Sequence, residues 1–149
     1  MLARRDLSVE EARARLAASG VAGPKVEDTV RWAVSAGYLD DAKLAAAVVE
    51  KELARKPPPA AELIVEKLRG RGIAAEVAAQ AVRANADRDT IAARVDGYVR
   101  SMRGRIPLAR LAGRLARAGH SPETVEALLG AGPNEEIDAE DHDAKDGND

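Results

Sequence analysis

Six arginines and no acidic residue lie between positions 100 and 117 of the chain. They are Arg100, Arg103, Arg105, Arg110, Arg114 and Arg117. Because a planar guanidinium group donates two parallel hydrogen bonds, arginine suits phosphate and carboxylate ligands. This run therefore predicts a partner-binding surface for anionic groups, with a merely solvated basic helix face as the alternative. Contacts to the phosphate backbone of DNA through such a surface would be non-specific and weakened by salt.

Other residue combinations do not predict catalysis, a metal site or a cofactor. The chain has no cysteine and two histidines, which excludes thiolate chemistry and makes a histidine-based metal site improbable. Gly70-Arg71-Gly72 stands where a helix ends, whereas a phosphate-binding loop opens one. Asp40 and Asp41 stand at a helix start, where capping explains both better than metal binding does. We therefore predict a protein that is not an enzyme and that has no cofactor.

Aromatic residues are scarce: the chain has no Phe, and its aromatic residues are Trp32, Tyr38 and Tyr98. Stacking of nucleic-acid bases needs aromatic side chains at the surface, so we expect no base stacking. Tyr38 is expected in the core at a helix junction. Trp32 lies off the apolar stripe of its helix and is expected to cover a repeat junction, with a partner anchor as the alternative. His120 follows a helix stop and is expected to be structural or exposed.

The charge of the chain is unevenly distributed. Residues 130–149 contain eight acids and one base, whereas the rest of the chain has an excess of five bases. A basic body suggests an anionic partner, and the acidic tail suggests either a solubilising segment or an intramolecular competitor for that partner.

The arginines after Pro107 need a helix to align them. Leu108, Leu111 and Leu115 form one stripe, and Arg110, Arg114 and Arg117 form another about a third of a turn away. One stripe can face a core while the other faces a partner.

That helix belongs to an internal repeat. Apolar residues stand 8 and 4 residues before a glycine and 6 and 10 residues after it, for Gly20, Gly72 and Gly119 alike. The three copies are Ala12, Leu16, Val26 and Val30; Ile64, Leu68, Ala78 and Val82; and Leu111, Leu115, Val125 and Leu129. A repeat at this period predicts stacked helical units.

The predicted fold is all-α, with tandem three-helix repeats in an elongated, curved stack. Helices are expected from Ser8 to Ser19, at 25–36, at 41–55, from Pro59 towards Gly72, and at 75–85, 87–102, 107–118 and 122–129, with 1–7 as the end of a truncated leading helix. The predicted units are 1–37, 38–86 and 87–129, followed by a disordered acidic tail at 130–149. With no membrane span or signal peptide in the sequence, we expect a cytoplasmic protein that does not bind membranes.

Four stretches stand in a fixed order and spacing over residues 2–129. They are Leu2-Ala-Arg-Arg-Asp-Leu-Ser8 with Glu11 and Leu16-x-x-x-Gly20, Ala36-Gly-Tyr-Leu-Asp-Asp-Ala42, Lys67-Leu68-x-x-x-Gly72-Ile73, and Leu111-x-x-x-Leu115-Ala116-Arg117-x-Gly119. Taken together, these stretches resemble the RecX regulatory protein family, whose members modulate the RecA recombinase.

The resemblance implies a monomer that binds in the groove of the RecA–DNA filament and restrains recombinase and ATPase activity. Two other functions are compatible with the residues. One is a helix-turn-helix DNA-binding module, although the second helices are rich in Ala, Val and Glu and offer few side chains for base edges. The other is a helical adaptor without a role at the filament.

Overall fold

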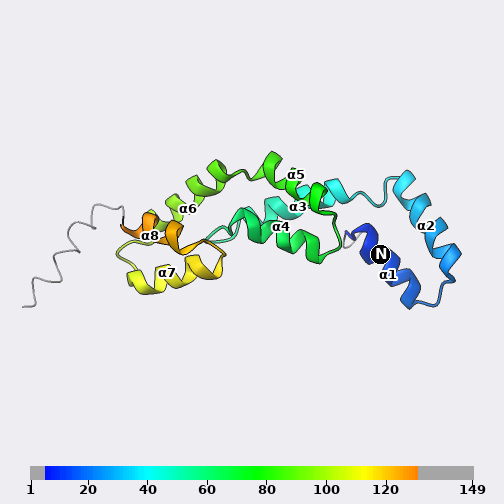
Figure 1. Ribbon diagram of the computed structural model, residues 1–149, viewed down its shortest axis with the longest axis horizontal. Coiled ribbons are helices and arrows are strands. Elements are labelled where there is room, and N and C mark those ends of the chain that lie inside the picture. The colour runs from blue at the N-terminus through cyan, green and yellow to red at the C-terminus, as the bar shows by residue number, and fades with distance from the viewer. Residues whose placement is uncertain (1–5, 131–149) are drawn as a thin grey trace, which may run out of the picture.

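The computed structural model describes residues 6–130, which form an elongated row of helices (Figure 1). The described helices are α1 (Val9–Ala18), α2 (Gly23–Ser35), α3 (Asp41–Leu53), α4 (Ala61–Gly70), α5 (Ala75–Asn85), α6 (Arg88–Met102), α7 (Leu108–Arg117) and α8 (Pro122–Gly130). No β-strand occurs in this part of the chain, so the predicted all-α fold is confirmed. None of these helices is long and apolar enough to span a lipid bilayer.

The repeat appears as one turn built three times. Gly20, Gly72 and Gly119 have φ values of 92°, 86° and 93°, in the left-handed region that favours glycine. In each copy the glycine N–H bonds back three residues, and the next N–H bonds to the carbonyl of the leucine four residues before the glycine. This is the Schellman motif. It supplies hydrogen-bond donors to carbonyl groups that have no partner within the first helix, and it sets the direction of the second helix.

Apolar side chains form two separate clusters. The first lies between α1 and α2 and includes Val26, Val30 and Leu39. The second runs continuously from α3 to α8 and includes Ile64, Leu68, Leu111 and Leu115, all fully buried. The predicted boundary at 86–87 therefore divides helices that share one core, whereas the first two helices have a core of their own.

Polar contacts join the first cluster to the second. The fully buried Ser8 hydroxyl accepts a hydrogen bond from the Glu11 N–H at 3.0 Å and donates one to the Arg71 carbonyl at 2.6 Å. Arg71 in turn donates from two nitrogens to the Glu11 carboxylate, at 2.8 and 2.9 Å. This bidentate hydrogen bonding raises the pKa of Arg71 above its ordinary value. In addition, Asp41 accepts a bond from the N–H of Val9 at the start of α1.

The next junction repeats this backbone geometry with apolar side chains. Ser8 and Ala60 both stand twelve residues before their own glycine, and each bonds to the carbonyl that precedes the next glycine. For Ala60 the donor is its N–H and the acceptor is the Ala118 carbonyl, at 2.9 Å. Leu63 occupies the position of Glu11 in this second junction, and it packs close to Gly119.

Two expectations about side chains and chain ends are wrong. Tyr38 is 64% exposed, because Gly37 turns the chain so that the neighbouring Leu39 takes the inward position. Asp6 and Leu7 are not helical, and Leu7 is buried in the first cluster. The predicted disordered tail lies outside the described residues apart from Gly130, which still belongs to α8. Residues 1–5 are outside the described part as well.

The Gly72→Ala substitution is expected to destabilise the protein more than Gly20→Ala. A Cβ at either position is strained by the positive φ, which costs about 1–2 kcal/mol. At position 72 the added Cβ would also lie 2.5 Å from the Cβ of Glu10, whereas position 20 faces open space. Urea denaturation followed by circular dichroism measures both changes. Equal losses for the two variants would contradict the close packing of this turn against α1.

The Ser8→Ala substitution is expected to lower the free energy of unfolding by about 2–4 kcal/mol. It removes a helix cap worth about 1 kcal/mol and leaves the Arg71 carbonyl without its buried donor, at about 1–3 kcal/mol. Ser121→Ala is the matched control, because Ser121 caps α8 at an exposed position and makes no contact between units. A Ser8→Ala loss no larger than that of the control would show that the buried contact adds nothing.

Candidate anion-binding site

The helix that carries the predicted arginine stripe is α7. Pro107 begins it, Gly119 ends it, and Leu111 and Leu115 fix its inner face in the core. Arg110 and Arg117 are exposed on the other side, and Arg114 is half-buried, with Nη1 donating to the Tyr98 hydroxyl at 3.1 Å. The predicted leucine stripe faces the core at Leu111 and Leu115, but Leu108 in the first turn of α7 is 40% exposed, so its predicted place in the inward stripe is wrong.

The remaining three arginines of the run have different surroundings. Arg100 pairs with Asp96 one turn earlier on α6, at 2.8 Å. Arg103 donates from Nη2 to the carbonyls of Leu128 and Leu129, both at 3.0 Å, so it closes the C-terminal end of α8. Arg105 is exposed in the turn between α6 and α7. Arg103 is therefore committed to a structural contact, and Arg100 is partly neutralised.

Two of the six arginines, together with basic residues from other elements, line a hollow of about 270 Å³. We call this hollow the basic groove and define it by its five charged residues, which are Arg55, Lys56, Lys67, Arg114 and Arg117. Helix α3 ends at Leu53, and the three prolines that follow Lys56 lead to Ala60, whose N–H bonds to the Ala118 carbonyl at the end of α7. The apolar parts of the lining come from Pro57, Pro59, Leu63 and Ala118.

One largely buried carboxylate pairs with two of these basic side chains. Glu52, with only 12% of its side chain exposed, accepts from Lys67 Nζ at 3.0 Å and pairs with Arg55 Nη1 at 3.6 Å. No other ion pair within residues 6–130 involves a groove base. The groove therefore retains an excess of positive charge, and its bases can accept a phosphate or carboxylate group.

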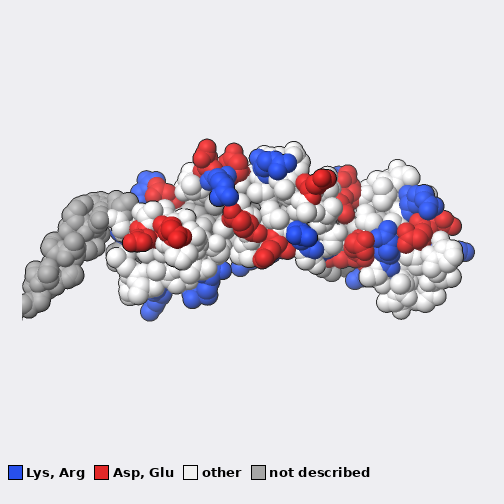
Figure 2. Space-filling model, in the orientation of Figure 1, with Lys and Arg blue, Asp and Glu red and all other residues white. Residues whose placement is uncertain are grey.

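A second hollow of about 270 Å³ continues the basic surface across the prolines. It shares Arg55 and Lys56 with the groove and adds Arg94 and Tyr98 from α6. Figure 2 shows that the face over α7 and α8 is largely uncharged apart from two acidic groups, with basic side chains protruding at the edge beside α7. The sequence missed Arg55, Lys56 and Lys67 as site residues; the signal was two bases immediately before a triple proline.

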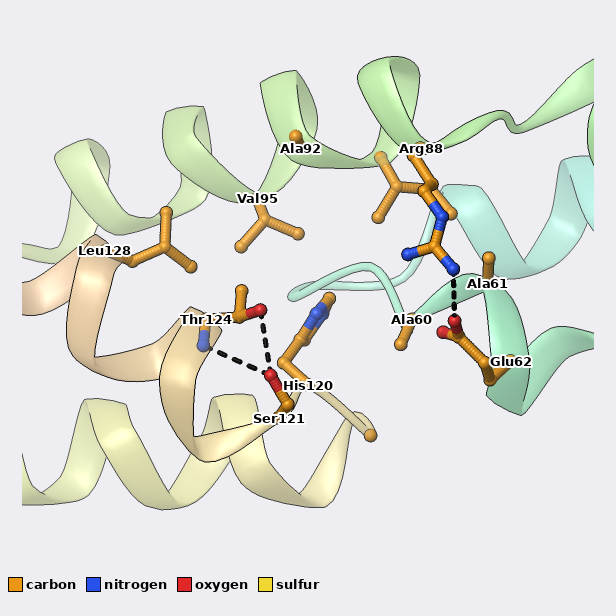
Figure 3. A pocket seen from close by; sticks show the side chains of 12 residues that line it. Ala60, Ala61, Glu62, Arg88, Ala92, Val95, His120, Ser121, Thr124 and Leu128 are labelled. Atoms are coloured by element: carbon orange, nitrogen blue, oxygen red, sulfur yellow. Dashed lines mark hydrogen bonds and ion pairs between the residues drawn. The ribbon is translucent and has the colours of Figure 1, made fainter.

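A larger cavity, of about 480 Å³, has a different character (Figure 3). It lies between the start of α4, α6 and α8, and Ala60, Ala92, Val95 and Leu128 make it mostly apolar. Glu62 lines it and pairs with Arg88 at 2.8 Å. A backbone hydrogen bond at Glu62, together with the charge of Arg88, lowers the pKa of this carboxyl group.

His120 at the edge of this cavity has a structural contact. Its Nε2 lies 2.8 Å from the carbonyl oxygen of Pro58, which ties the start of α8 to the proline segment. Asp40 caps α3 as predicted. Asp41 instead accepts a hydrogen bond from the N–H of Val9 at the start of α1, a contact with another helix that the sequence did not predict. No cluster of potential metal ligands occurs among the residues that the structure describes.

Two aromatic residues are exposed at the far end of the molecule. Trp32 and Tyr38, at 60% and 64% exposure, stack with ring centroids 5.3 Å apart. The sequence argument against base stacking assumed that no aromatic platform reaches the surface, and this assumption is wrong. Trp32 lies on α2 and Tyr38 follows that helix, so the pair is at the end of the row formed by α1 and α2, whereas the basic groove lies where the segment between α3 and α4 meets the end of α7 (Figure 1).

Comparison with known proteins identifies the fold. No protein-family model matches the sequence, and no curated protein matches it either. The structure, however, superposes on the crystal structure of RecX from Lactobacillus salivarius with a TM-score of 0.69. The match covers 87% of this chain and 88% of that chain, at 12% sequence identity. The tandem helical repeat of this chain therefore has the RecX fold.

Proposed function

We propose that this protein is a RecX-type regulator that binds the RecA–DNA filament and inhibits its recombinase and ATPase activity during recombination and DNA repair. The observation that supports this most strongly is the similarity to a RecX structure over nearly the full length of both chains. The arrangement of charge is a second and independent support, since a filament on DNA presents rows of phosphate groups.

The shape of the molecule suits a groove-bound inhibitor. Residues 6–130 form a narrow row in which the first unit and the basic groove lie far apart (Figure 1). A ligand of this length would contact more than one subunit of a helical filament. Inhibition then follows from bridging neighbouring subunits, which opposes the movement that accompanies ATP hydrolysis and blocks the exchange of DNA strands.

We assign the anionic contacts to the basic groove together with Arg110, which is exposed one turn before Arg114 on α7. Arg105, exposed before α7, and Arg100, which is exposed and pairs with Asp96, are proposed as further contacts outside the groove. Arg103 is not assigned to the anionic contacts, because it donates hydrogen bonds to the carbonyls of Leu128 and Leu129 in α8. The contacts are to phosphate rather than to bases, since arginine and lysine at a groove provide charge without a base-specific pattern.

The helix-turn-helix alternative has weak support. In such a module the second helix of each pair enters the major groove and contacts base edges with polar side chains. The exposed residues of α5 are Ala75, Glu76, Gln80, Arg83, Ala84 and Asn85. Of the polar ones, Glu76 is an acid that phosphate repels, and Arg83 and Asn85 already donate to acceptors on the same helix, the Gln80 side chain and the Ala81 carbonyl. Strong, sequence-selective binding to bare duplex DNA would favour this alternative over the filament.

Addition of the full-length protein is expected to lower DNA-dependent ATP hydrolysis by RecA from the same organism. The assay uses RecA filaments on circular single-stranded DNA and measures phosphate release as the protein is titrated. A folded sample that changes neither hydrolysis nor strand exchange at saturation would refute the proposed function.

Replacing groove bases by glutamine is expected to weaken binding to single-stranded DNA and to filaments. The variant carries Arg55→Gln, Lys56→Gln and Arg117→Gln, all at exposed positions. If all three contact phosphate, the slope of log K against log salt concentration falls by about 2, at about 0.7 per contact. Fluorescence anisotropy over a range of salt concentrations measures this slope.

The matched control carries Lys25→Gln, Lys43→Gln and Arg83→Gln, which remove the same charge at exposed sites outside the groove. Circular dichroism checks that both variants keep their helices. Equal salt slopes for the two variants would mean that the groove is not the contact surface.

A further inference from the structure

The basic groove has a potential occupant within its own chain. The segment after α8 contains acids at eight positions and a single base, Lys145. The six acids nearest to one another span nine residues and are Glu135, Glu136, Asp138, Glu140, Asp141 and Asp143. Ile137 is the one large apolar residue in this stretch, so any docking of the segment relies on charge.

The groove offers complementary charge. Lys56, Arg114 and Arg117 have no ion pair to an acid within residues 6–130, and Glu52 is the single carboxylate that pairs with the groove bases. The larger cavity of Figure 3 is a poorer receptor for an acidic segment, because it is mostly apolar and Glu62 lines it. Carboxylates of the tail therefore match the groove and are disfavoured at the cavity.

The acidic segment is also within reach of the groove. Helix α8 packs against α7 and runs back alongside it, so the described chain ends at Gly130 about one helix length from the groove (Figure 1). The path to the groove is about 14 Å along α8 and about 10 Å across to α7. An extended chain covers about 17 Å from Gly130 to Glu135 and about 45 Å to Asp143. The acids therefore lie at the distances that the groove requires.

We propose that residues 135–143 occupy the basic groove and compete there with the phosphate groups of a nucleic acid. The identity of the displaced ligand rests on the proposed function, whereas the contact between tail and groove does not. Because the two are covalently linked, the tail is present at an effective concentration in the millimolar range. Individually weak carboxylate–guanidinium pairs then suffice to keep the groove occupied, and a polyanion of higher charge density displaces the tail.

The direct test is nuclear magnetic resonance of the full-length protein without any ligand. The tail-neutral variant replaces the six acids named above by Gln or Asn and keeps the chain length. The Nε–Hε signals of Arg114 and Arg117 are expected to shift between wild type and variant, while those of Arg83 stay in place. Unchanged groove signals would overturn the proposal, whatever the filament assays show.

Affinity for a 15-nucleotide oligo(dT) gives the functional consequence. At about 50 mM salt the tail-neutral variant is expected to bind about tenfold more tightly than wild type, a difference of about 1.4 kcal/mol. The gain should vanish near 1 M salt, where the Debye length is about 3 Å. It should also vanish when Arg55→Gln, Lys56→Gln and Arg117→Gln are added.

A control with the same change in net charge separates tail docking from general repulsion. It carries substitutions of six exposed acids of the body, Glu50→Gln, Glu66→Gln, Glu76→Gln, Asp89→Asn, Glu123→Gln and Glu126→Gln. An equal gain in affinity for this control would overturn the proposal. If the groove signals shift but the filament is not inhibited, the tail contact is supported and the proposed function is refuted.

Discussion

The structure depends on a left-handed glycine that follows a leucine by four residues. At Gly20, Gly72 and Gly119 the left-handed conformation allows the last carbonyls of one helix to accept hydrogen bonds within a single turn. The second helix therefore starts in the same direction in each copy. The same turn exposes the carbonyl just before the glycine. That carbonyl is the acceptor for the preceding unit, through the Ser8 hydroxyl in one junction and the Ala60 N–H in the other. One local conformation therefore determines both the shape of a unit and the way units stack.

The basic groove is a consequence of the second junction. The hydrogen bond from Ala60 to Ala118 brings the proline segment beside the end of α7. Arg117 immediately precedes Ala118, while Arg55 and Lys56 immediately precede the prolines, so this contact places both sets of bases around one hollow. Glu52 then holds Lys67 and Arg55 at its wall. The charges converge because the backbones dock, so the positive charge of the groove follows from the fold rather than from one helix.

Sequence reasoning succeeded where the determining interactions are local. The Leu-x-x-x-Gly spacing predicts a helix end within five residues, and the capping pattern at Ser8 and Glu11 involves neighbours three apart. It failed where partners are distant in the chain. The bond from Ser8 to Arg71 spans 63 residues, and Arg103 reaches α8 across 25 residues. Tyr38 was misplaced for another reason: two adjacent residues in a turn cannot both point inward, and the choice between Tyr38 and Leu39 is made by the geometry of Gly37.

The two junctions share a backbone frame but differ in side-chain chemistry, and this difference has physical consequences. At the second junction Leu63 packs against Gly119 beside the core that runs from α3 to α8, and salt does not weaken apolar contacts of this kind. At the first junction the Arg71–Glu11 pair is 27% exposed on each side, so added salt partly screens it. Helices α1 and α2 are therefore joined to the rest of the molecule by a contact that is more sensitive to salt than the second junction is.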